Sequence, residues 1–90
     1  MELNHLRSKI DTIDNQLIQL INKRCELVSQ VGKYKKLKSL PPLDQSRWDE
    51  VMKSRIEQGK QCGLSEKLIR SIFEAIHEEA LVIEGKIQNE

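Results

Sequence analysis

The sequence predicts an all-α fold of three helices with a very long first helix, and three observations indicate it. Apolar residues recur at alternating steps of three and four through most of the chain, which is the spacing of one helical face. Paired prolines at positions 41 and 42 and a glycine at position 63 divide this pattern into three segments. No segment shows the apolar–polar alternation that is typical of strands. With 90 residues, near the lower end of what one core can stabilise, we expect a single domain over residues 1–90.

The first predicted helix covers about residues 3–38. Its main apolar stripe consists of Leu3, Leu6, Ile10, Ile13, Leu17, Leu20, Leu27, Val31 and Tyr34. A second stripe widens this face and consists of Ile18, Ile21, Cys25 and Val28. The helix is expected to end in the segment LKSLPPLD, because the paired prolines exclude helix for themselves and disfavour it at Leu40.

The second and third predicted helices cover about residues 45–60 and 66–88. Asp44 and Ser65 are the expected N-caps, because their side chains can accept hydrogen bonds from the free amides of a first turn. The second helix is expected to direct inward Trp48, Val51, Met52 and Ile56. The stripe of the third helix consists of Ile69, Phe73, Ile76, Ala80, Ile83 and Ile87.

The length of the first helix predicts an intertwined helical homodimer. At ~1.5 Å per residue, some 36 residues make a rod of roughly 54 Å. A compact domain of this size has a radius of gyration of only about 12 Å. The helix must therefore overhang its own domain and expose apolar surface. A second copy of the chain, with the two long helices side by side, covers that surface most simply.

Composition and charge argue against several classes of protein. Fifteen basic and fourteen acidic residues give a net charge of +1, without the excess of positive charge that is typical of proteins that bind nucleic acid. The segment MELNHLRSKID is charged from residue 2, and no apolar run approaches the ~18 residues of a membrane span. We therefore expect a protein without membrane attachment, located in the cytoplasm. Cys25 and Cys62 are expected to be reduced thiols, and the isolated His5 and His77 ordinary surface or boundary residues.

Arg24 stands within the apolar seam of the first helix, where a buried charge needs a partner. One interpretation is an ion pair within the protein, for example with an acid of the third helix. The position of Lys35 favours a second interpretation, a ligand site. Lys35 follows Arg24 by eleven residues, which places it within about 20° of the same helical face and ~16 Å along the axis. With Val28, Val31 and the small Gly32 between them, the two cations could hold a small dianion from both ends over a low floor.

Two further arginines extend this cluster of cations. Arg7 lies about 100° around the helix from Arg24 and some 25 Å away, so it cannot serve the same site in its own chain. It could serve the site of an adjacent chain. Arg47, in the first turn of the second helix, adds a cation near the Lys35 end.

These cations and their spacing resemble the all-helical class of chorismate mutases, and the similarity covers nearly the whole chain. The matching segments are LRSKIDTIDNQLIQLINKRCELVSQVGKYK, DQSR and LSEKLIRSIFEAI. The resemblance implies rearrangement of chorismate to prephenate, a step of aromatic amino acid biosynthesis. That reaction is an intramolecular shift that needs no metal, cofactor or nucleophile, and we expect none here.

The resemblance also implies a role for individual residues. Arg24 and the partner subunit's Arg7 would bind the two substrate carboxylates. Lys35 would contact the ether oxygen of the substrate, and Asp44 and Arg47 would line the end near its ring hydroxyl. Arginine suits such a site because its planar fork fixes a carboxylate in orientation. A lysine held in advance stabilises the negative charge that builds on the ether oxygen as the C–O bond breaks.

Three positions on the second and third helices complete the implied site. Glu84 stands where the family has a Gln or Glu that also reaches the ether oxygen, although a solvated glutamate near a helix end is the alternative interpretation. Position 48 is Trp where many members carry a Glu that binds the substrate hydroxyl, and a core anchor is the alternative there. Ala80 stands where some members have a Ser that touches a carboxylate.

Two other functions fit parts of the pattern. An isochorismate-pyruvate lyase resembles the mutases in fold and in most cations, and it too can lack the Glu at the position of Trp48. A non-catalytic helical module, for dimerisation or effector binding, would not require Arg24 and Lys35 on one face.

Overall fold

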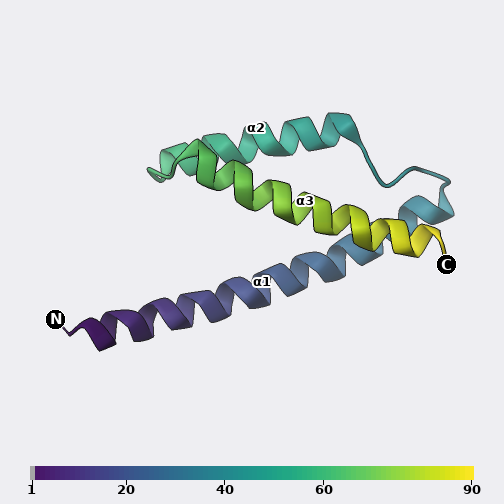
Figure 1. The fold of residues 1–90 in the computed structure, drawn as a ribbon. Helices are drawn as coiled ribbons and strands as arrows, with labels where there is room; N and C mark the ends of the chain where they lie inside the picture. The colour runs from purple at the N-terminus through teal and green to yellow at the C-terminus, as the bar shows by residue number, and fades with distance from the viewer. Residues whose placement is uncertain (1) are drawn as a thin grey trace.

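The structure, a computed structural model, describes residues 2–90 and consists of three helices joined by two loops (Figure 1). Helix α1 spans Leu3–Leu37, α2 spans Gln45–Gln61 and α3 spans Glu66–Gln88. No strand occurs in this part of the chain. The predicted all-α fold, with three helices and a very long first one, is confirmed.

The ends of the helices follow from local chemistry. The predicted caps are confirmed: Asp44 Oδ1 accepts a hydrogen bond from the amide of Arg47 at 3.0 Å, and Ser65 Oγ accepts one from the amide of Leu68 at 3.1 Å. Gly63 takes a φ of 77° in the turn between α2 and α3, a left-handed conformation that glycine adopts without a steric cost. Each cap therefore fixes the residue at which α2 or α3 begins.

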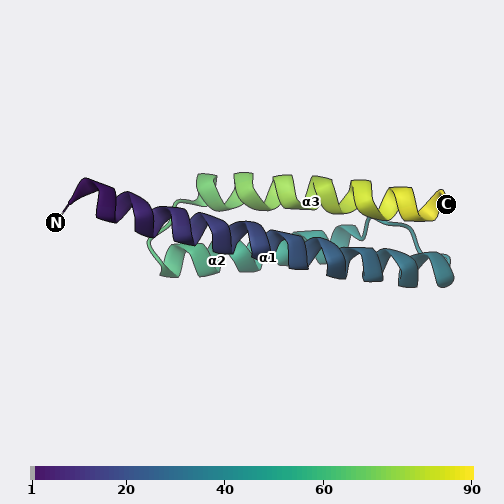
Figure 2. The same ribbon diagram turned by 90° about the horizontal axis from the view of Figure 1, so that it is seen from below.

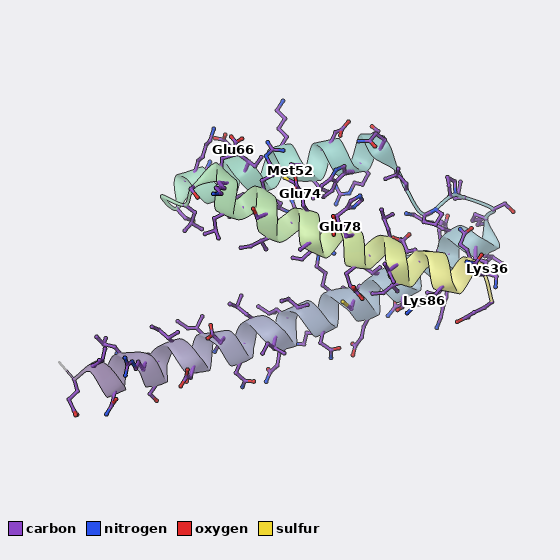
Figure 3. The ribbon with its side chains drawn as sticks, viewed as in Figure 1. Lys36, Met52, Glu66, Glu74, Glu78 and Lys86 are labelled. Atoms are coloured by element: carbon purple, nitrogen blue, oxygen red, sulfur yellow. The ribbon has the colours of Figure 1, made fainter. Side chains whose placement is uncertain are left out.

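Helix α3 packs against both other helices. Figure 1 shows α2 and α3 as an antiparallel hairpin, with α1 crossing the C-terminal half of α3. Figure 3 shows Met52 between α2 and α3, and Met52 is one of the few buried apolar residues of the described chain. The others are Val51, Ile69 and Ile87. The core of the chain is therefore small and lies along α3.

Two glycines allow the helices to approach closely. A Cβ at Gly32 of α1 would lie 3.0 Å from Ile87 Cδ1 and 3.2 Å from Glu84 Cγ, both on α3. A Cβ at Gly59 of α2 would collide with the side chain of Ile69. The prediction that Gly32 lies in a floor between Arg24 and Lys35 is wrong. Gly32 is buried at the crossing of α1 and α3, because its missing side chain lets the two backbones meet there.

The N-terminal half of α1 extends past the other two helices, as Figures 1 and 2 both show. Its apolar side chains are all 39–66% exposed, and together they form what we call the N-terminal apolar face: Leu3, Leu6, Ile10, Ile13, Leu17, Ile18, Leu20 and Ile21. The radius of gyration is 16.3 Å, well above the roughly 12 Å of a compact chain of this length. The expected overhang of α1 is thus present. None of the helices described has the length and apolar character needed to cross a membrane.

Candidate active site

All three helices contribute to a cavity of about 210 Å³ beside the crossing of α1 and α3. Its charged lining residues are Arg24, Lys35, Asp44, Arg47, Arg55 and Glu84. Trp48 and Ala80 also line it. Every own-chain residue that the sequence predicted for the site therefore borders one cavity.

Lys35 and Glu84 form the most buried polar contact of the cavity. The Nζ atom of Lys35 lies 2.8 Å from Oε1 of Glu84, and the two side chains are 17% and 8% exposed. Lys35 also donates a hydrogen bond to the carbonyl oxygen of Pro42, which ties the loop before α2 to α1. Among the residues that the structure describes, Oε1 of Glu84 has no hydrogen-bond partner, so its contact with Lys35 is an ion pair only. The alternative of a solvated Glu84 is wrong, because α3 turns this residue toward α1 beside Gly32.

Arg24 is half-buried on the cavity wall, next to Val28 and Val31. Within residues 2–90, no carboxylate lies within ion-pair distance of its guanidinium. The alternative interpretation, an ion pair with an acid of the third helix, is therefore not found in this chain. Arg24 faces the cavity with its hydrogen-bond donors unused, which is the condition of a group that binds an anion.

Asp44 and Arg47 lie at the rim of the cavity and are exposed. The Asp44 carboxylate is engaged as the cap of α2, and the Arg47 side chain pairs with Glu50 at 3.0 Å on the surface. A surface pair of this kind contributes little to stability, so the Arg47 guanidinium can exchange Glu50 for a ligand at small cost.

Trp48 and His77 form part of the cavity wall. Their rings stack with centroids 3.9 Å apart and planes 10° apart, and both residues are half-buried. Trp48 thus lines the cavity, as expected for a site residue, and also packs α2 against α3. His77, expected to be an ordinary boundary residue, precedes Ala80 and Glu84 by three and seven positions, so helical spacing could have placed it on their face.

Arg55 lines the cavity and was missed from the sequence. It follows Trp48 by seven positions and Val51 by four, which puts the three residues on one face of α2. Since Trp48 was already a candidate, this spacing was the signal that could have identified Arg55.

Arg7 does not line this cavity. It is exposed near the beginning of α1, on the part of the helix that extends past α2 and α3. The prediction that Arg7 cannot reach the site of its own chain is confirmed.

The electrostatics of the cavity suit a small dianion. Four cationic side chains and two carboxylates line it, so with His77 neutral the lining carries a net charge of +2. Its volume of about 210 Å³ lies below the roughly 300–1,000 Å³ of sites for drug-sized ligands. The size and charge of the cavity are therefore compatible with a small anionic ligand.

The chain belongs to the chorismate mutase type II family, whose sequence model matches residues 6–85. It is 38% identical to the T-protein of Haemophilus influenzae over 84 residues, which cover 93% of this chain and 22% of that protein. It is 34% identical to the bifunctional chorismate mutase/prephenate dehydratase of Escherichia coli K12 over 77 residues, or 86% of this chain and 20% of that enzyme. A more distant relative is the 4-amino-4-deoxychorismate mutase of Streptomyces pristinaespiralis, 23% identical over 93% of this chain and 65% of that enzyme.

The chain spans about a fifth of the length of the T-protein and of the bifunctional relatives that it matches. The likeness to these proteins thus concerns one segment of each.

Proposed function

We propose that this protein is a chorismate mutase, which rearranges chorismate to prephenate in aromatic amino acid biosynthesis. The observation that carries the proposal is the cavity: seven predicted site residues from three helices border it, and its lining has the charge that balances a dianion. Membership of the chorismate mutase type II family supports the same reaction.

In this proposal the cations fix the substrate in a compact conformer from which the rearrangement can proceed. Arg24 binds one carboxylate, and Arg7 of the partner subunit binds the other. Asp44 and Arg47 line the end that receives the ring hydroxyl. Holding both reacting ends of one molecule in place supplies much of the acceleration of such a unimolecular reaction.

Lys35 and Glu84 act on the ether oxygen. Lys35 is held by Glu84 and by the Pro42 carbonyl before any substrate arrives, so it does not have to reorganise as charge develops. Glu84 can donate a hydrogen bond to the ether oxygen only when its carboxyl is protonated. Ala80 lacks a side-chain donor, so the carboxylate near it is bound by other groups.

The proposed enzyme is an intertwined homodimer. The N-terminal apolar face is uncovered in one subunit, and eight exposed apolar side chains in one helix half need an apolar partner. A second copy presents a matching face of the same length. The same arrangement brings Arg7, which its own chain leaves unused, to the open side of the partner's cavity.

One observation favours a second candidate, an isochorismate-pyruvate lyase. Trp48 contributes no carboxylate to the cavity, whereas many mutases have a Glu there that binds the substrate hydroxyl. A lyase would eliminate pyruvate from isochorismate in the same cationic cavity.

Purified protein mixed separately with chorismate and with isochorismate, followed by NMR identification of the products, tests these functions. A mutase gives prephenate from chorismate, and a lyase gives salicylate and pyruvate from isochorismate. Arg24→Ala is the control, since loss of the product in this variant assigns the activity to the cavity. Unchanged substrates with the wild-type protein would contradict both enzymes and favour a non-catalytic helical module.

A further inference from the structure

Arg55 is a half-buried guanidinium on the cavity wall without an acidic partner. Within the described part of the chain no carboxylate lies within ion-pair distance of it. Among residues 2–90, the one hydrogen bond that its side chain makes goes to the neutral hydroxyl of the adjacent Ser54, at 3.2 Å. Because a guanidinium has five N–H donors, most of the hydrogen-bonding capacity of Arg55 remains free.

The course of the helices places Arg55 at the Arg24 end of the cavity. The loop before α2 is tied to Lys35 through Pro42, and α2 runs antiparallel to α1 from there (Figure 1). Arg24 lies eleven positions back from Lys35 along α1, and Arg55 lies eleven positions on from Asp44 along α2. The Lys35–Glu84 pair thus marks one end of the cavity, and two guanidinium groups from different helices lie toward the other.

No other residue on the cavity face of α2 neutralises Arg55. The α2 residues that line the cavity are Arg47, Trp48, Val51 and Arg55 itself, and none of them carries a negative charge. A partly buried cation without a counter-charge is costly, and an anionic ligand removes that cost. The free donors and the missing counter-charge together point to a ligand carboxylate as the partner.

We infer that Arg55 is a further substrate-binding residue, which pairs with one carboxylate of the substrate beside Arg24. This inference rests on the proposed function, because it takes the ligand to be chorismate. Arg55 contributes to substrate binding and does not contact the ether oxygen, which lies at the Lys35–Glu84 end of the cavity. Its loss should therefore raise KM far more than it lowers kcat.

The test compares Arg55→Met with Lys53→Met. Both substitutions remove one cation from α2 and keep a long side chain, but Lys53 is exposed and does not line the cavity. We expect Arg55→Met to raise KM for chorismate, and Kd for prephenate by calorimetry, by about 10- to 100-fold, the loss of one charged hydrogen-bonding group. Lys53→Met should leave both constants within about twofold of wild type.

The outcomes separate the inference from the proposed function. If wild-type protein forms no prephenate, the proposed function fails, whatever Arg55 does. If wild type is active and Arg55→Met leaves KM and Kd unchanged, the inference is overturned. Sedimentation and thermal melts of each variant show whether the substitution disrupts dimerisation or folding, which would indicate a structural role for Arg55. If Arg55→Met fails to fold or dimerise, Arg55→Lys is the variant to test. A folded Arg55→Lys protein with a raised KM supports the inference. An Arg55→Lys protein that also fails to fold or dimerise overturns it.

Discussion

At the scale of single residues, the contact between Lys35 and Glu84 determines how the cavity can treat the ether oxygen. The 2.8 Å ion pair neutralises the lysine in the free protein and holds it in place. During the proposed reaction the same carboxyl must either donate a proton in a hydrogen bond or repel the developing negative charge. Whether the side chain at position 84 can donate a hydrogen bond is thus expected to affect activity.

Glu84→Gln should raise kcat/KM roughly tenfold or more, because an amide can donate a hydrogen bond to the ether oxygen whereas a carboxylate repels the negative charge that develops there. The measurement is kcat/KM of both proteins under the same neutral conditions. Glu79→Gln, an exposed glutamate on the same helix, is the control and should keep the wild-type value. Equal kcat/KM in Glu84→Gln and wild type would remove Glu84 from the mechanism.

Arg24→Leu should abolish most activity and leave the protein folded. Among residues 2–90 the guanidinium has no acidic partner, and replacing an unpaired, half-buried charge by an apolar side chain is often neutral or stabilising. Loss of a charged contact to the substrate should lower kcat/KM by about 100-fold or more. Thermal melts and steady-state kinetics measure the two effects. A strongly lowered melting temperature would show instead that Arg24 has a structural partner in the assembled protein.

At the scale of helices, close packing at two glycines positions the cavity residues. Gly32 allows α1 to meet Glu84 and Ile87, and Gly59 allows α2 to meet Ile69. Because α3 is in contact at both places, it fixes the distance between the cations of α1 and those of α2. The rotation of α3 about its own axis brings His77, Ala80 and Glu84 to the cavity.

Gly59→Ala should destabilise the protein, whereas Gly85→Ala should stabilise it. Each change gains up to about 1 kcal/mol of helix propensity. A Cβ at Gly59 collides with Ile69, and overpacking of this kind costs about 1–3 kcal/mol, while a Cβ at Gly85 meets nothing within 4 Å. Denaturant unfolding of both variants measures the difference. Equal stability of the two variants would contradict the close packing of α2 on α3.

At the scale of the whole molecule, the chain is elongated and leaves apolar surface exposed. It measures 56 × 26 × 14 Å, and its longest helix leaves the N-terminal apolar face uncovered. The cavity contains every predicted cation except Arg7. Both deficits are removed together if the N-terminal half of one α1 lies across the cavity of a second subunit.

Mixing the inactive variants Arg7→Ala and Arg24→Ala should restore activity. After joint unfolding and refolding, a heterodimer has one site with both defects and one site with neither. Random pairing makes about half of the dimers heterodimers, so roughly a quarter of all sites should be intact, provided the subunits pair without preference. Refolded wild type and each variant refolded alone are the controls. No recovery in the mixture, with wild type surviving the same treatment, would show that the sites are not shared between subunits.

The helices of this protein could be predicted from its sequence more completely than the contacts between the helices. The three helices follow from local rules: the prolines at 41 and 42, the caps Asp44 and Ser65, and the left-handed turn at Gly63 need no knowledge of the rest of the fold. The common face of Arg24 and Lys35 follows from helical periodicity within one element. These features depend on residues near one another in the chain.

The tertiary structure alone decided what depends on contacts between helices. Whether Glu84 is buried against Lys35 or solvated depends on how α3 is rotated against α1, which is set by the close approach at Gly32. Arg55 and His77 become cavity residues only because α2 and α3 pack through Gly59 and Ile69 with one particular face of each inward. Periodicity within one helix shows which residues share a face, but packing between helices determines what that face meets. The sequence by itself therefore determined the helices and the alignment of their cations, and the packing of α3 decided which side chains form the cavity.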